Sequence, residues 1–299
     1  MPRTFVIGTR GSALALRQVE IVAAALRSRH ADLRFEVREI RTEGDRSSAP
    51  LSAIGGLGVF TKAIEDALLA REVDLAVHSL KDLPADLTPG LALAAIPARA
   101  DPRDALVTRN GSGLDALPPG ARIGTGAGRR AVQLRALRPD AVPEEIRGNV
   151  DTRIRKVREG QYDGAVLAAA GLDRLGLLHE AAQVFSVAEM LPAVGQAALA
   201  VQTRADDDEA RALAAAIDDA QARVAVTAER AFLRTLGAGC RLPVAGYATV
   251  EQEALRLRAL VATDDGRLVR ADERATSDEA EALGERVGRA LLAESAARA

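Results

Sequence analysis

The sequence predicts an α/β fold, because β-prone and helical segments alternate along most of the chain. Two short motifs also recur. Residues 7–9, Ile-Gly-Thr, reappear at 123–125, and residues 74–77, Asp-Leu-Ala-Val, are echoed at 163–166 as Asp-Gly-Ala-Val. These echoes indicate two α/β lobes of similar build with a cleft between them, although motifs this short also recur by chance. We expect mainly parallel sheets.

The first lobe is predicted from a regular succession of strands, turns and helices. An opening strand leads through a turn at residues 8–12 into a helical pattern. Glycines make residues 55–58 a flexible loop before the next helix, and a short apolar strand then leads into residues 78–82. We expect strands at 4–7, 34–40 and 73–77, and helices at 13–29 and about 59–70.

A second lobe and a smaller third region follow. Pro97 and Pro192 mark the expected crossings between the lobes. After Thr227 the apolar residues alternate, which favours antiparallel strands with helices, and the glycines around Cys240 place it on an exposed loop. We expect strands ending at 123–125 and at 244–250, 255–261 and 268–270, helices at 129–137, 222–236 and 277–297, and a loop at 237–243.

The composition argues against several classes of protein. The formal net charge is −2 and the pI about 6.0, whereas nucleic-acid binders usually carry a basic surplus. Aromatic residues make up only 2% and tryptophan is absent, which argues against base-stacking surfaces. One cysteine and three histidines leave no material for an internal disulfide or a Cys-rich zinc site.

We also expect no targeting segment or membrane-spanning helix. Residues 1–10 contain no apolar stretch of the kind found in signal peptides. The longest apolar runs, such as residues 165–172, are far shorter than the ~20 residues that a membrane-spanning helix needs. We therefore expect a cytoplasmic protein.

Arginines gather at predicted strand-to-helix junctions. Arg129 and Arg130 follow a Gly-rich turn at a predicted helix N-terminus, where backbone N–H groups and the helix dipole favour anions. Arg10 ends the first strand, and Arg147 and Arg153 flank another turn. Singly, each is more often part of a solvated helix face. Together they favour a crevice that binds carboxylate or phosphate groups.

The turn at residues 124–128 is not a nucleotide-binding signature. Arg129 stands where the dinucleotide motif G-x-G-x-x-G requires glycine, and no Walker-type Gly-Lys-Ser/Thr occurs in the chain. The sequence therefore gives no support for a nucleotide cofactor.

Lys81, Asp82 and Cys240 are the candidates for chemistry. Lys81 and Asp82 follow an apolar strand; the plainer interpretation is a turn with a solvated lysine, and the functional one is a carboxylate that exchanges protons. A lone cysteine is more often a small buried hydrophobe. However, Cys240 lies between glycines and Arg241, and a loop thiol beside a cation suits covalent attachment.

A series of short motifs links these residues to a known family. They are residues 8–16 (GTRGSALAL), 77–84 (VHSLKDLP), 101–104 (DPRD), 147–149 (RGN), 191–196 (LPAVGQ), 227–230 (TAER) and 239–240 (GC). Any one motif is weak, but the ordered set is specific and covers nearly the whole chain. In this ordered set of motifs the sequence resembles the porphobilinogen deaminase (hydroxymethylbilane synthase) family.

The resemblance implies two α/β lobes like those of periplasmic binding proteins and a small C-terminal α+β domain that bears the cofactor. The implied domains are 1–97 with 198–217, 98–197, and 218–299. It also implies a transferase of tetrapyrrole and heme biosynthesis. Such an enzyme condenses four porphobilinogen molecules head to tail on a covalent dipyrromethane cofactor, with loss of four ammonia, and releases linear hydroxymethylbilane. A cytoplasmic monomer without nucleic-acid or membrane partners is expected.

The resemblance also implies roles for single residues. Cys240 carries the cofactor through a thioether, and Asp82 is the catalytic acid. Porphobilinogen carries an acetate and a propionate, and each charge-assisted contact to such a group contributes roughly 1.5–3 kcal/mol. The residues expected to bind the cofactor are Ser12, Lys81, Arg129 and Arg130, and those expected to bind the substrate are Arg10, Thr125, Arg147, Arg153 and Gln196.

Two positions depart from the family pattern. Leu57 stands where many relatives have lysine, which removes one loop cation. Residues 126–128, Gly-Ala-Gly, stand where most relatives have Ser-Ser-Leu, which removes two hydroxyl groups but leaves the backbone N–H groups. Neither departure affects Cys240 or Asp82.

Two other functions are compatible with parts of the pattern. A non-enzymatic anion-binding protein of the periplasmic type would also have two lobes and arginine-lined turns, but the third region with Cys240 argues against it. A nucleic-acid binder is opposed by the pI and the scarcity of aromatic residues.

Overall fold

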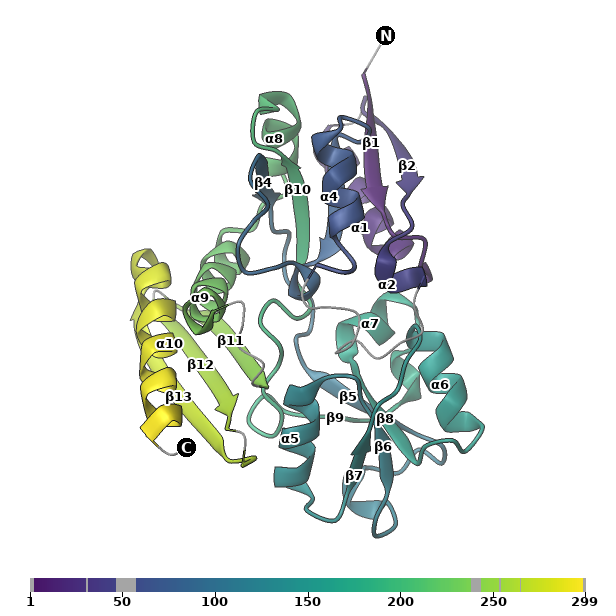
Figure 1. Cartoon of the computed structure of the whole chain (residues 1–299). Helices are drawn as coiled ribbons and strands as arrows, with labels where there is room; N and C mark the ends of the chain where they lie inside the picture. Colours follow the sequence, from purple (N-terminus) through teal and green to yellow (C-terminus); the bar gives the residue numbers. More distant parts are fainter. Residues whose placement is uncertain are drawn as a thin grey trace. The chain divides into compact units, whose positions relative to one another are not determined.

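The computed structural model describes residues 3–30, 32–46, 58–237, 243–252, 254–263 and 265–297. The chain forms two compact units, each discontinuous in sequence. Unit 1 combines residues 1–100 with 197–223, and unit 2 combines residues 101–196 with 224–299. Figure 1 labels the helices and strands of both units.

Unit 1 is built around one sheet (Figure 1). Its elements are β1 (Thr4–Thr9), α1 (Ala13–Arg29), β2 (Arg34–Glu39), α2 (Glu43–Arg46), α4 (Lys62–Leu69), β3 (Leu75–Ser79), a 3₁₀ turn (Leu80–Asp82), β4 (Leu91–Ala95), β10 (Leu199–Arg204) and α8 (Asp208–Ala215). The strand order is β2-β1-β3-β10-β4. Helices α1 and α8 pack on one face of the sheet and α4 on the other, because side chains alternate along each strand.

Unit 2 begins with a second sheet. Its elements are β5 (Asp104–Thr108), β6 (Arg122–Gly124), α5 (Gly128–Leu137), β7 (Val142–Glu144), α6 (Val150–Arg158), β8 (Gly164–Ala168), α7 (Ala169–Arg174), β9 (Ala181–Val184) and 3₁₀ turns at Leu114–Ala116 and Leu178–Glu180. The strand order is β7-β6-β8-β5-β9. Helix α5 packs on one face, and α6 and α7 pack on the other.

The two sheets have the same topology. In unit 1, β1 lies between β2 and β3, and in unit 2, β6 lies between β7 and β8. The registers also agree, since Gly8 pairs with Ala76 and Gly124 pairs with Ala165. The sequence echoes therefore mark equivalent strands, and the prediction of two similar α/β lobes is confirmed.

The expectation of mainly parallel sheets is wrong. Each sheet has two parallel pairings, and its other two are antiparallel. In each sheet the strand that is antiparallel to both of its neighbours, β10 or β5, is the one with which the chain enters that unit from the other. No helical crossover within the unit sets the direction of such a strand, so local alternation could not reveal it.

Strand β3 is shifted relative to its predicted position. Residues 73–77 were expected, whereas β3 runs from Leu75 to Ser79. Asp74 precedes the strand because its backbone N–H donates to Val6 O and its carboxylate accepts from Val6 N (2.8 and 2.9 Å). At its other end β3 continues to Ser79, because that residue pairs with Leu199 of β10.

The rest of unit 2 is a small α+β region, as predicted. It contains α9 (Ala220–Leu236, in unit 2 from residue 224), β11 (Val244–Glu251), β12 (Ala254–Ala262), β13 (Leu268–Thr276), a 3₁₀ turn (Ser277–Glu279) and α10 (Ala280–Ala297). The antiparallel sheet β11-β12-β13 packs against both helices. Helix α10 lies so close to α9 that a Cβ on Gly284 would stand 2.2 Å from Ala228 O.

Candidate functional site

The carboxyl ends of β1 and β3 carry the predicted site residues of unit 1. Ser12 caps α1, since its hydroxyl oxygen accepts from the Ala15 N–H at 3.3 Å. Arg10 is half-buried, and its guanidinium stacks over the Phe60 ring at 4.2 Å. Both residues therefore lie where strand β1 gives way to helix α1.

Lys81 and Asp82 lie in the 3₁₀ turn that directly follows β3. The turn is fixed by Leu80, which is buried and donates its N–H to Ala198 O at 3.0 Å. Both Lys81 and Asp82 are half-buried. A carboxylate and an ammonium group are thus held at the end of a buried strand, within reach of solvent.

A small cavity lies at these strand ends within unit 1. It is lined by Thr9, Arg10, Ala15, Gln18, Phe60, Thr61, Ile64, Val77, His78, Ser79 and Asp82. Its polar wall includes a hydrogen bond from Gln18 Nε2 to Ser79 Oγ (2.8 Å). The geometry thus brings the predicted residues Arg10 and Asp82 to the same cavity.

A buried ionic cluster is the corresponding feature of unit 2. Arg129 and Arg130 of α5 both pair with Asp104 of β5, at 2.5 and 2.7 Å. The Arg129 and Arg130 side chains are 6% exposed and that of Asp104 is 0% exposed, so the pairs are removed from solvent. Gln196 links to the cluster, since its Oε1 accepts from Arg129 and its Nε2 donates to Asp104 (2.9 and 2.8 Å).

The cluster carries an excess of positive charge. Burial alone would raise the pKa of Asp104, but the charges and hydrogen bonds of Arg129 and Arg130 hold that pKa well below its usual range. Asp104 is therefore ionised and balances only one of the two guanidinium charges. Such a cluster attracts a further carboxylate.

Thr125 lies at the junction between β6 and α5. It is buried, its N–H donates to Glu144 O at 2.7 Å, and its hydroxyl oxygen accepts from Ala127 N at 3.2 Å. The N-cap of α5 is Ala127, which has no side-chain acceptor. No N-cap side chain therefore accepts from the first backbone N–H groups of α5, at the position where the sequence predicts anion binding.

Arg147 and Arg153 flank the start of α6. Arg153 Nε donates to Gly148 O at 2.8 Å, and Arg147 O accepts from Lys156 Nζ at 3.2 Å. Gly148 has a φ of +110°, which only glycine adopts easily, so it permits the tight turn before the helix. Both arginine side chains are half-buried.

Cys240, Arg241 and Leu57 lie outside the described residues, as does most of the glycine loop at 55–58. The structure therefore places the predicted residues Arg10, Ser12, Lys81 and Asp82 in unit 1, and Thr125, Arg129, Arg130, Arg147, Arg153 and Gln196 in unit 2.

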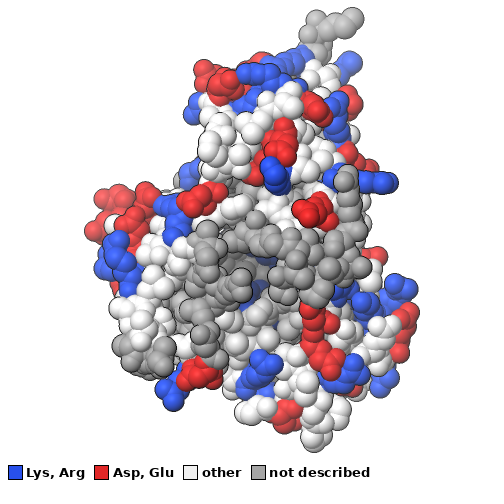
Figure 2. All heavy atoms as spheres, in the orientation of Figure 1, with Lys and Arg blue, Asp and Glu red and all other residues white. Residues whose placement is uncertain are grey.

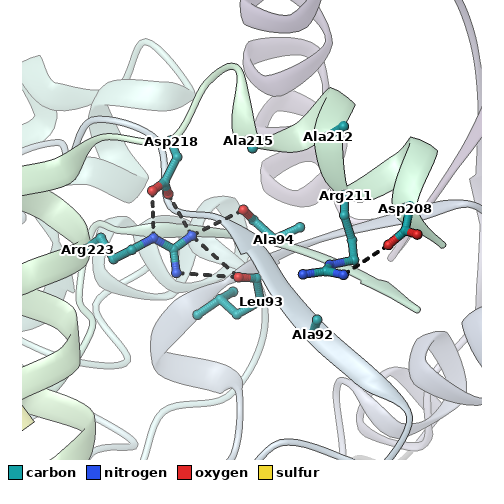
Figure 3. Close-up of a pocket in the computed structure, with 9 residues that line it drawn as sticks. All are labelled: Ala92, Leu93, Ala94, Asp208, Arg211, Ala212, Ala215, Asp218 and Arg223. Atoms are coloured by element: carbon teal, nitrogen blue, oxygen red, sulfur yellow. Dashed lines mark hydrogen bonds and ion pairs between the residues drawn. The ribbon is translucent and has the colours of Figure 1, made fainter. Parts of the chain in front are cut away.

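A larger hollow of unit 1, about 540 Å³, lies beside the outer strand β4 and helix α8 (Figure 3). There Arg223 pairs with Asp218 at 2.6 Å and donates to the carbonyl groups of Leu93 and Ala94. These bonds occupy carbonyls at the sheet edge that could otherwise pair with another strand. Because no predicted site residue is among the described residues that line it, we assign this hollow no role in catalysis.

Charged side chains of both signs are interspersed over the face displayed in Figure 2, in keeping with the net charge of −2. Within the described ranges, no helix is long and apolar enough to cross a membrane. The same ranges contain no group of three or more side chains suited to hold a metal ion.

Two functional candidates were missed at the sequence level. Asp104 was noted only as part of a motif, although a charged residue next to the apolar run 105–107 signals a buried ion pair. His78 likewise interrupts an apolar strand, and it is 5% exposed and lines the cavity with Asp82.

Comparison with known protein families shows which family the chain belongs to. The family model for the porphobilinogen deaminase, dipyromethane cofactor binding domain matches residues 5–212, and that for the porphobilinogen deaminase, C-terminal domain matches residues 223–293. The chain belongs to the porphobilinogen deaminase family. The family resemblance is thereby confirmed, and the predicted dipyrromethane cofactor and transferase class agree with it.

Individual relatives support the same assignment. The chain is 51% identical to porphobilinogen deaminase of Roseiflexus sp., over 98% of this chain and 100% of the relative. It is 46% identical to that of Thermus thermophilus, over 97% of this chain and 96% of the relative. Among solved structures, the methionine binding protein MetQ matches with a TM-score of 0.46 and 13% identity, covering 77% of this chain and 94% of that one.

Proposed function

We propose that this chain is a hydroxymethylbilane synthase. It condenses four porphobilinogen molecules head to tail on a covalent dipyrromethane cofactor, with loss of four ammonia, and releases linear hydroxymethylbilane. Family membership over nearly the full chain supports the proposal. The structural observation that carries it is that Asp82 and Arg10 line one cavity at the ends of β1 and β3. A carboxylate that exchanges protons and a cation that binds carboxylates are the groups that porphobilinogen requires.

Asp82 is the proposed catalytic acid. Each condensation breaks a C–N bond of the substrate, and the departing amine takes up a proton. A half-buried carboxylate at a rigid strand end can give that proton and later take one back from the pyrrole carbon. Proton transfer of this kind typically contributes ~10²–10⁴-fold to the rate.

The arginine cluster fits a ligand that carries carboxylate groups, such as dipyrromethane. Two guanidinium charges face one carboxylate in a buried setting, so the cluster retains one positive charge. We propose that Arg129 and Arg130, with Ser12 and Lys81, bind the cofactor carboxylates, and that Cys240 carries the cofactor as a thioether. When bound, dipyrromethane supplies the pyrrole carbon to which the first substrate adds.

The remaining predicted residues are proposed to bind the substrate. Arg10, Arg147 and Arg153 are half-buried cations, and they suit the acetate and propionate groups of porphobilinogen. Thr125 and Gln196 are buried, and Gln196 is hydrogen-bonded to Arg129. We propose that these two residues take part in substrate binding and that they also hold the α5 turn and the Arg129 side chain in position.

The division into domains and the cellular context are also proposals. Three sheets support the domains 1–97 with 198–217, 98–197 and 218–299, the last bearing Cys240. We further propose a cytoplasmic monomer of tetrapyrrole and heme biosynthesis, with no nucleic-acid or membrane partner. A non-enzymatic anion-binding protein of the periplasmic type is not favoured, because relatives 46% to 51% identical over 96% to 100% of their length bear the deaminase name.

The test is an assay of both products. Purified protein is incubated with porphobilinogen, and ammonia and hydroxymethylbilane are measured, with Cys240→Ser as the matched control. The proposal expects four ammonia for each bilane from the wild type and neither product from the control. Reversible binding of porphobilinogen without ammonia release would instead establish a binding protein.

A further inference from the structure

A buried glutamine lies one turn after Arg129 on helix α5. Gln133 is 0% exposed, and its side-chain amide pairs with both backbone groups of Leu191. Its Oε1 accepts from Leu191 N at 2.8 Å, and its Nε2 donates to Leu191 O at 3.1 Å. Nε2 also donates to Arg129 O at 3.1 Å. Because an amide both donates and accepts, one glutamine can fix the backbone of Leu191 to helix α5.

Leu191 begins a stretch of chain that depends on such individual bonds. The described segment 191–196 contains neither helix nor strand. Leu191 is 3% exposed and Gln196 is 0% exposed, so the polar groups at both ends of the segment are removed from solvent and need partners. The position of the segment is therefore set by separate hydrogen bonds rather than by a ladder of paired strands.

Both ends of this segment contact the arginine cluster. Leu191 O accepts from Arg129 Nη1 at 3.2 Å. At the other end, Gln196 Oε1 accepts from Arg129 Nη2 at 2.9 Å, and Gln196 Nε2 donates to Asp104 at 2.8 Å. The orientation of the Arg129 guanidinium thus depends on where segment 191–196 lies.

The rest of the segment is held from another side. Gly195 N donates to the Glu229 carboxylate at 2.6 Å, and Pro192 O accepts from Gly246 N at 3.0 Å. Neither bond involves helix α5. Loss of the glutamine amide should therefore shift the start of the segment without releasing all of it.

The equivalent glutamine of unit 1 has a different partner. Gln18 takes the place of Gln133, since each is the sixth residue of its helix. Gln18 Nε2 donates to Ser79 Oγ at 2.8 Å, within its own helix and sheet. Ala168 takes the place of Ser79 in unit 2, and its methyl group accepts no hydrogen bond. The pairing with Leu191 is thus particular to unit 2, which carries the two arginines.

We propose that Gln133 is a positioning residue for the cofactor site. By holding Leu191, it sets the orientation of the Arg129 guanidinium toward a cofactor carboxylate. This inference rests on the proposed function, in which Arg129 binds dipyrromethane. The strength of a contact between guanidinium and carboxylate depends on its geometry, so a displaced guanidinium binds more weakly. Loss of Gln133 should therefore weaken uptake of the cofactor and leave the later chemical step almost unchanged.

The test uses Gln133→Met, which keeps the length of the side chain and removes the amide. Gln183→Met is the matched control, because Gln183 Oε1 accepts from Leu114 N at 2.8 Å, a side-chain bond to the backbone of unit 2 outside the cluster. Each full-length chain is produced in cells that make no porphobilinogen and is then incubated with graded concentrations of it. Denatured intact mass gives the fraction of chain that carries dipyrromethane, and urea unfolding gives the stability.

The two glutamine variants should differ in cofactor uptake but not in stability. In Gln133→Met, the porphobilinogen concentration that modifies half of the chain should rise about three- to tenfold, as expected for a weakened hydrogen bond. The rate of bilane formation per modified chain should stay within about twofold of the wild type. Gln183→Met should show a similar shift of the urea midpoint and take up the cofactor as the wild type does.

A double variant tests whether the effect passes through Arg129. Arg129→Lys keeps the charge but lacks the planar fork of donors. Because Gln133 acts through that fork, adding Gln133→Met to Arg129→Lys should cause no further rise in the half-modifying concentration. Should Arg129→Lys take up no cofactor, the comparison of Gln133→Met with Gln183→Met decides.

Three results would overturn the inference: an unchanged half-modifying concentration in Gln133→Met, an equal rise in Gln183→Met, or an additive effect in the double variant. If Gln133→Met does not fold, Gln133→Glu replaces it with the same expectation, because it keeps the acceptor for Leu191 N and loses the donor to Leu191 O. A wild type that gains no mass from porphobilinogen would refute the proposed function itself. That result is distinct from a wild type that is modified and a variant that matches it.

Discussion

The two five-stranded sheets of this protein share one strand order, but their buried polar clusters lie on opposite faces. In unit 2 the polar side chains lie under α5, where Asp104 meets Arg129 and Arg130. In unit 1 they lie under α4, where Gln202 and Thr88 both donate to the Glu65 carboxylate, beside His78. The matching face of unit 2 is apolar, and that of unit 1 is apolar apart from the hydrogen bond between Gln18 and Ser79.

This difference shows that the fold itself does not require the buried polar residues. Leu199 of unit 1 occupies the strand position that Asp104 has in unit 2, and Val107 of unit 2 occupies the position of Gln202. Both apolar residues are buried in ordinary cores. The sheet thus forms with either an apolar or a polar residue at these positions. We therefore expect the two polar clusters to have functional roles.

The largest effect is expected from Asp82→Ala. Loss of the proposed acid should lower the rate of bilane formation by ~10²–10⁴-fold, because proton transfer to the departing amine is removed. Asp86→Ala, at an exposed position on the same loop, is the matched control and should keep normal activity. Steady-state assays and thermal melting check both variants. Normal turnover in Asp82→Ala would show that Asp82 is not the catalytic acid.

Replacing the residues of the arginine cluster with their unit 1 counterparts tests whether the cluster has only a structural role. Asp104→Leu alone leaves two buried guanidinium groups without their anion and should cost about 3–5 kcal/mol of unfolding free energy. Leu14 and Ala15 are the second and third residues of α1, as Arg129 and Arg130 are of α5. The triple variant Asp104→Leu, Arg129→Leu, Arg130→Ala therefore gives unit 2 the residues of unit 1, and it should recover most of that stability in urea unfolding. It should also lose cofactor binding. A triple variant that retains the cofactor would show that the cluster has no part in holding it.

The acid response of stability should distinguish the two clusters. The folded pKa of His78, about 4, lies below its unfolded value of about 6.5, so the unfolded chain takes up the proton first as the pH falls. The unfolding free energy should therefore fall by about 2 kcal/mol between pH 7 and pH 5. Asp104, with its lowered pKa, keeps its contribution until the pH falls below about 4, where unfolded aspartate takes up a proton.

Urea unfolding of His78→Leu at both pH values measures the histidine contribution directly. The variant should lose this part of the pH dependence, whereas Asp104→Leu should keep it. An unchanged pH dependence in His78→Leu would mean that the pKa of His78 is the same in the folded and the unfolded protein.

The smallest effect concerns the equivalent helices α1 and α5. Ser12 caps α1, whereas Ala127 precedes α5 without a side-chain acceptor. Ser12→Ala should cost about 1 kcal/mol of stability. Ala127→Ser should add a similar amount and weaken anion binding, because its oxygen would compete for the first N–H groups of α5. Equal melting temperatures for all three proteins would contradict this account of the two helix starts.

The sequence predicted features that depend on local pattern. Helix α1 begins and ends as expected, and the Ile-Gly-Thr echo identified equivalent strands. Lys81 and Asp82 were expected to follow a buried strand, as they do. These features follow from side-chain periodicity and turn residues within a short stretch of chain.

Features that depend on distant residues were not predicted. Strand β10 enters the sheet of unit 1 after an excursion through unit 2, so its antiparallel direction has no local signal. Gln202 meets Glu65 across 137 residues, and Gln196 meets Asp104 across 92. Such pairs arise only when the sheets assemble, and a single sequence holds no direct record of them.

The central claim is most directly tested by the denatured intact mass of the purified protein, measured before and after addition of porphobilinogen, with Cys240→Ser alongside. The account predicts a mass increased by one dipyrromethane in the wild type only, and then a ladder of species with successive pyrrole units. A wild type that stays unmodified before and after porphobilinogen, with the mass of the bare chain, would contradict it.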